Sequence, residues 1–100
     1  MTSVMDKIEA LKSVGAEDLV NQTLAKLIEL EINRLRQAQQ RLKTELESFE
    51  KAYHMTSEEC YRKFESGELG DAVEFFEWTS LYEIYQDNEQ ALRLLEEKRL

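Results

Sequence analysis

Residues 25–53 read AKLIELEINRLRQAQQRLKTELESFEKAY, and the spacing of their apolar side chains decides the fold. Two series of positions, each repeating every seven residues and offset from the other by four, alternate along this stretch. The first series is Ile28, Leu35, Leu42 and Phe49, and the second is Ala25, Ile32, Gln39, Leu46 and Tyr53. This spacing is typical of the seam of a coiled coil or of an antiparallel helical hairpin.

The same stretch belongs to a longer run, residues 16–53, that contains neither glycine nor proline. Strong helix formers dominate this run. At a rise of about 1.5 Å per residue the predicted helix is about 54 Å long, too long for the core of a compact globule. It must therefore pack along another long helix. Gln39, the one polar residue of the seam, either fixes the register of that packing or lies where the seam opens to water.

Two shorter helices are predicted beside the long one. Apolar residues at 3- and 4-residue spacing predict a helix over residues 1–15. Gly15 ends it, because glycine enters the left-handed region without a Cβ penalty. Thr56 and Glu59 have the spacing of a capping box, which predicts a short helix over residues 57–66.

A second long helix is predicted over residues 72–98, with a start signal at Asp71. Its apolar residues between 73 and 85 cover more than one stripe, so the helix needs partners on more than one side. We therefore expect an all-α fold, with residues 1–100 forming a single helical domain. The expected architecture is a long antiparallel coiled-coil-like hairpin with short helices at its ends, which dimerises into a helical bundle.

The composition limits the classes of protein. Three glycines and no proline argue against an all-β fold with many tight turns. With 21 acidic and 13 basic residues the formal net charge is −8, which favours a basic protein partner over nucleic acid. No apolar run approaches the roughly 18 residues of a membrane span, and the acidic N-terminus is unlike a signal peptide. The single cysteine, Cys60, cannot form an internal disulfide, so we expect a cytoplasmic protein.

Residues that carry chemistry are few. His54 is the only histidine, and a pair with Cys60 would lack a third catalytic member and an oxyanion feature. One histidine and one cysteine cannot build a structural zinc site within one chain. The sequence therefore predicts no enzymatic activity, no metal and no cofactor.

The aromatic-acidic segment, residues 74–87, is the most informative part of the chain. Residues 56–100 hold five basic and twelve acidic residues, so most of the net charge lies on the same part of the chain as most of the aromatic residues. Aromatic side chains are favoured interface anchors, and an acidic rim steers a basic partner. The partner-binding residues predicted on this basis are Phe75, Trp78, Tyr82, Tyr85, Glu77 and Glu83, with Trp78 as the main anchor. The alternative is that the aromatic side chains belong to an ordinary bundle core and the acidic side chains lie on the solvent-exposed side of the helix.

Four short pieces of the sequence together resemble a known group of proteins. They are YHMTSEE at residues 53–59, FESGELGD at 64–71, FEW at 76–78 and LYE at 81–83. The pattern resembles small helical archaeal and cyanobacterial proteins from toxin–antitoxin-like gene pairs. Residues 72–73 and 79–80 depart from that pattern, which holds acids after the Gly-Asp and alanines after the Glu-Trp. The resemblance implies an antitoxin, and it carries no binding residues over to this chain.

Two functions fit these observations. The first is a non-enzymatic antitoxin that masks a small basic partner toxin, for example one that acts on RNA. The second is a self-associating structural or adaptor protein with no inhibitory role. A transcriptional regulator fits less well, because the chain is acidic and shows no recognisable recognition helix.

Overall fold

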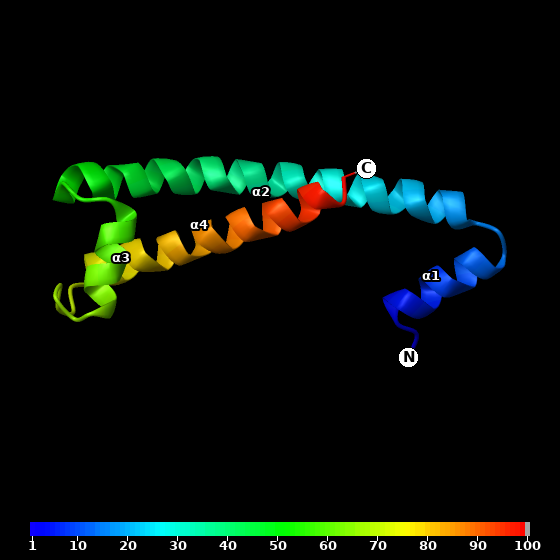
Figure 1. Ribbon diagram of the computed structural model, residues 1–100, viewed down its shortest axis with the longest axis horizontal. Helices are drawn as coiled ribbons and strands as arrows, with labels where there is room; N and C mark the ends of the chain where they lie inside the picture. Colours follow the sequence, from blue (N-terminus) through cyan, green and yellow to red (C-terminus); the bar gives the residue numbers. More distant parts are fainter. Residues whose placement is uncertain (100) are drawn as a thin grey trace.

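The structure, a computed structural model that describes residues 1–99, is built from α-helices, and no strand occurs in that part of the chain. The helices are α1 (Val4–Ser13), α2 (Glu17–Tyr53), α3 (Ser57–Glu65) and α4 (Val73–Glu97). Helix α4 runs back along α2 in the opposite direction, while α3 and α1 lie at opposite ends of the molecule (Figure 1). The molecule is elongated, at 60 × 27 × 18 Å. The predicted all-α hairpin with short helices at its ends is confirmed.

Local sequence explains where α1 begins and ends and where α3 begins. Helix α1 starts later than predicted because Ser3 and Asp6 form a reciprocal capping box that sequence analysis missed. Gly15 has a φ of 85°, the left-handed conformation expected just after a helix. The prediction that Thr56 caps α3 is confirmed in part, because its hydroxyl accepts a hydrogen bond from the Glu59 amide at 3.1 Å. The Glu59 carboxylate lies 3.3 Å from the Lys63 ammonium.

The predicted cap at the start of α4 is wrong. The N-cap residue is Ala72, and no side chain caps the helix there. Gly70 adopts a φ of 74° and Ala72 is still extended, so the chain enters the helix only at Val73. Asp71 therefore lies one position too early to accept a hydrogen bond from the first turn.

The core lies between α2 and α4 and divides into two clusters. Near the middle of α2, Ile32 and Leu35 pack against Leu92, and these three residues form one buried cluster. Nearer the α3 end, Leu46 packs with Cys60 and Trp78 to form the second. Burial of these apolar side chains holds the two long helices together.

Gln39 lies in the same seam, and it is not open to water. Only 7% of the residue is exposed, and its side-chain amide donates hydrogen bonds to the Tyr85 carbonyl at 2.9 Å and the Glu89 carboxylate at 3.0 Å. These bonds favour the first of the two sequence-based alternatives, in which Gln39 fixes the register. Its side-chain oxygen is buried without a hydrogen-bond partner among residues 1–99.

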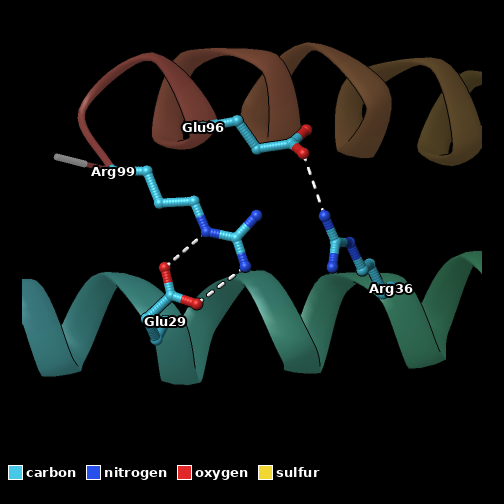
Figure 2. Close-up of polar contacts among 4 residues, drawn as sticks. All are labelled: Glu29, Arg36, Glu96 and Arg99. Carbon is cyan, nitrogen blue, oxygen red and sulfur yellow. Dashed lines mark hydrogen bonds and ion pairs between the residues drawn. The ribbon is translucent and has the colours of Figure 1, made fainter.

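Ion pairs join the last turns of α4 to α2 (Figure 2). The Arg99 guanidinium donates two hydrogen bonds to the Glu29 carboxylate, at 2.7 and 2.8 Å, and Arg36 donates one to Glu96 at 2.9 Å. The hydrogen bonds from Arg99 lower the pKa of Glu29 and raise the pKa of Arg99. The overlap of the two helices therefore ends near Glu29, and the first ten or so residues of α2 extend beyond it (Figure 1).

Within the described part of the chain, no helix combines the length and the apolar character that a membrane span requires.

Candidate partner-binding surface

Trp78, the predicted main anchor, is a core residue. Its exposed fraction is 0%, and its ring stacks on Phe49 with a centroid distance of 5.4 Å and an angle of 10° between the planes. Helix α3 packs against α4 and covers the apolar side that α2 leaves open. The prediction that Trp78 contacts a partner is therefore wrong, because a partner cannot reach a side chain enclosed by three helices.

The Trp78 indole is also held by a polar chain that sequence analysis missed. Its N–H donates to the Ser57 hydroxyl at 2.9 Å, and that hydroxyl donates to the Glu50 carboxylate at 2.8 Å. The Ser57 amide donates to the same carboxylate oxygen at 2.8 Å. A buried tryptophan needs a hydrogen-bond acceptor, and that requirement is the signal that points to a polar residue such as Ser57. The chain fixes α3 between α2 and α4.

Phe75 also belongs mainly to the core. It is half-buried, and its ring lies 5.1 Å from the Tyr53 ring and 6.4 Å from the Trp78 ring, measured between centroids. Of the other residues predicted to bind a partner, Glu77 and Glu83 are exposed, and Tyr82 and Tyr85 are half-buried like Phe75.

Tyr82 and Tyr85 lie side by side on α4 and line two adjoining grooves. The first groove, about 230 Å³, is lined by Lys43, Leu46, Glu47, Glu50, Ser57, Tyr82 and Tyr85. The second, about 390 Å³, is lined by Tyr82, Tyr85, Gln86, Asp87, Glu89, Gln90 and Arg93. Half-buried tyrosines between grooves offer a partner both apolar rings and hydroxyl groups.

Tyr61 of α3 extends this surface. Its ring lies 5.8 Å from the Tyr82 ring, and its hydroxyl donates to the Glu83 carboxylate at 3.0 Å. We call the resulting surface the acidic tyrosine face and define it as Tyr61, Tyr82, Tyr85, Glu47, Glu50, Glu83, Asp87 and Glu89. Glu77 lies elsewhere, because six residues rotate a helix by about 240° relative to Glu83.

The pKa of each of the three tyrosines is raised above its ordinary value. The hydrogen bond to Glu83 raises the pKa of Tyr61, with smaller effects from burial and nearby acids. Burial raises the pKa of Tyr82 and of Tyr85, and neighbouring carboxylates raise each further. Burial disfavours charge of either sign, so only the part of each shift that comes from neighbouring carboxylates indicates a site that favours a cationic group.

The acids of this face are not neutralised by ion pairs. Within residues 1–99 the ion pairs are Arg34–Glu31, Arg36–Glu96, Lys63–Glu59 and Arg99–Glu29. None of them includes an acid of the acidic tyrosine face. Two basic residues, Lys43 and Arg93, line the grooves but form no ion pair with these acids in the described part of the chain.

The two residues with catalytic potential, Cys60 and His54, are not part of this face. Cys60 is fully buried, and burial raises the pKa of its thiol. His54 is exposed at the end of α2, with a φ of 54°. Over residues 1–99, no group of three His, Cys, Asp or Glu side chains is placed to hold a metal ion.

Comparisons of the chain with protein-family profiles, curated proteins and solved structures found no significant match. The resemblance of residues 53–85 to proteins of toxin–antitoxin-like gene pairs stays a prediction. The geometry and charge of the acidic tyrosine face are therefore the features that indicate a function.

Proposed function

We propose that the chain is a non-enzymatic protein-binding module that binds and masks a small basic partner through the acidic tyrosine face. One observation carries the proposal: half-buried tyrosines line grooves among carboxylates that take part in no ion pair within residues 1–99. An antitoxin that neutralises a basic toxin is the form of this function that the sequence predicts.

The chemistry of the face fits such a partner. Tyr82 and Tyr85 supply rigid aromatic contact area next to grooves, as in the central contacts of many interfaces. Glu83 and Asp87 are exposed, so they steer a cationic partner towards the tyrosines and speed its association at low salt. The cytoplasm is the compartment that we propose, because the one cysteine has no partner for an internal disulfide.

We propose that the chain acts as a homodimer. Large apolar side chains remain exposed on the single chain, mostly towards its N-terminal end. Exposed apolar patches of more than a few hundred Å² usually mark interfaces. The same observation favours the second candidate function, a self-associating structural or adaptor protein without an inhibitory role.

Affinity capture from cells of the native organism tests partner binding. The wild type is compared with a Glu83→Lys/Asp87→Lys variant and with a matched control, Glu9→Lys/Asp18→Lys. Both variants change the net charge equally, and all four acids are exposed. We expect the wild type and the control to capture a small basic protein that salt elutes. The Glu83→Lys/Asp87→Lys variant should lose it.

Co-expression separates the two candidate functions. An antitoxin should relieve the growth arrest caused by the captured protein, and the Glu83→Lys/Asp87→Lys variant should not. A captured protein whose expression leaves growth unchanged would favour the adaptor. Equal capture by all three baits would refute the acidic tyrosine face as the binding surface.

A further inference from the structure

The N-terminal end of the molecule extends beyond the hairpin. Helix α4 ends at Glu97, and Arg99 pairs with Glu29 of α2. Helix α1 and residues 17–27 of α2 therefore project past the end of α4 and are not covered by it (Figure 1). Among residues 1–99, α1 makes contact with α2 and with no other helix.

Apolar side chains concentrate on this projecting end. Eight large ones on this end or directly next to it are between 39% and 79% exposed: Val4, Met5, Leu11, Val14, Leu19, Leu24, Leu27 and Leu30. A groove of about 290 Å³ runs between α1 and α2, lined by Val4, Lys7, Ile8, Leu11, Leu19, Val20, Thr23 and Leu24. Its lining is almost wholly apolar, so water solvates it poorly.

Helix α1 is incompletely supported in the single chain. It has ten residues, and none of them is buried. A helix this short is marginal in water without tertiary packing. On α2, only Val20 is buried next to it. An occupant that covers the groove would bury the apolar side of α1 and stabilise the helix.

Charge indicates which occupant fits. Residues 1–27 hold three lysines and four acids, whereas residues 56–100 carry a net charge of −7. Two copies that approach through their C-terminal halves repel each other, while the N-terminal ends are close to neutral. A second copy of the chain can therefore meet the first through this end with little electrostatic opposition.

The apolar side chains in and around the groove supply an area close to the lower limit for a stable dimer. Complete burial of one Val, Leu or Met side chain removes on the order of 60–120 Å² of apolar surface from water. Eight side chains about half exposed thus supply roughly 500–1,000 Å² over two copies. Because apolar atoms form about 65% of a homodimer interface, the total is roughly 750–1,500 Å². Stable interfaces bury about 1,000 Å² or more.

We propose that the groove between α1 and α2, together with the exposed apolar side chains around it such as Leu27, is the homodimer interface and that its occupant is the same end of a second copy. The proposal rests on the homodimer proposed above and names its surface. Two α1 helices and two N-terminal segments of α2, related by a two-fold axis, form a four-helix arrangement. The acidic tyrosine face shares no residue with this groove, so it stays free in each copy.

Sedimentation equilibrium of the full chain over a wide concentration range tests the proposal. We expect the wild type to have twice the monomer mass of 11.8 kDa. Leu19→Glu and Leu27→Glu should each weaken the dimer about tenfold or more, because they place a charge in the apolar interface. Both leucines are more than half exposed, so the monomer should keep its helical circular dichroism. The matched control is Phe76→Glu, at a residue that is 65% exposed near the α3 end.

Four results would overturn the proposal. A monomeric wild type would refute the homodimer, and partner capture would then be judged separately. A dimer that Leu27→Glu leaves intact, or that Phe76→Glu disrupts equally, would refute only the surface. Flotation of the wild type with phosphatidylcholine vesicles, lost in Leu27→Glu, would assign the groove to lipid.

Discussion

Among single residues, Ser57 links three helices, because it hydrogen-bonds to Trp78 of α4 and to Glu50 of α2. It is 4% exposed at the start of α3, where a surface serine would be ordinary. Its hydroxyl accepts the Trp78 indole N–H and donates to Glu50, so it satisfies a buried donor from one helix and an acceptor from another. Buried polar groups without partners destabilise a fold, and Ser57 prevents this at the centre of the second core cluster.

Replacing Ser57 with alanine should therefore destabilise the protein. Ser57→Ala leaves the Trp78 indole N–H buried without an acceptor, which costs about 1–3 kcal/mol of unfolding free energy. Urea denaturation followed by circular dichroism measures the change. Ser48→Ala is the control, because Ser48 is exposed and its hydroxyl bonds only to the Thr44 carbonyl. Equal midpoints for the two variants would contradict the structural role of Ser57.

Among elements, α2 pairs with α4 through buried apolar side chains and through one hydrogen-bonded polar side chain, Gln39, which favours a single register. Gln39 lies between the two core clusters and bonds across the seam to the Tyr85 carbonyl and to Glu89. Its side-chain oxygen is buried without a hydrogen-bond partner among residues 1–99, and this lowers the stability of the fold. The seam is therefore not optimised for stability at this one position.

Replacement of Gln39 by leucine should leave stability unchanged or raise it by about 1 kcal/mol. The change removes a buried acceptor without a partner and continues the apolar seam, while Glu89 is partly exposed and can bind water. Thermal and urea unfolding measure the difference. Leu35→Ala, at a buried seam residue, serves as the reference and should lose about 2–5 kcal/mol. A loss above about 2 kcal/mol in Gln39→Leu would show that its two hydrogen bonds outweigh the buried oxygen.

At the scale of the whole molecule, negative charge is concentrated towards one end. The net charge is −8, and residues 56–100 carry most of it. Three tyrosines at that end have a pKa raised above the usual 10.0 by burial and by neighbouring carboxylates. Their ionisation adds further negative charge where the molecule is already most acidic.

Stability should therefore fall on the alkaline side. The folded pKa of these tyrosines lies above the unfolded value, so their contribution is complete below pH 10 and is lost as the pH rises through the folded pKa. Thermal melts at increasing pH should show a decline that begins near pH 10. A Tyr61→Phe/Tyr82→Phe/Tyr85→Phe variant should decline less steeply. The same slope in both proteins would contradict the assignment to these residues.

The sequence determines the long helices and their antiparallel pairing. The 4-then-3 spacing over residues 25–53 and the absence of glycine and proline from residues 16–53 are local features, and helix formation and seam burial depend mainly on such features. The same reasoning located the short helices, because caps and glycines act within a few residues. It missed the capping box of Ser3 and misplaced the start of α4, since either of two neighbouring residues can begin a helix.

Only the tertiary structure decided which aromatic residues are buried and which are accessible. Trp78 and Tyr82 lie four residues apart on one helix, so they share a face and the sequence predicts the same burial for both. The packing of α3 against α4 makes their burial differ. Ser57 of α3 bonds to Trp78, which is buried, whereas Tyr61 of α3 lies beside Tyr82, which is only half-buried. The uncovered groove at the N-terminal end likewise depends on where α4 ends along α2. Both outcomes depend on how separate helices meet in space, which the periodicity of a single helix does not encode.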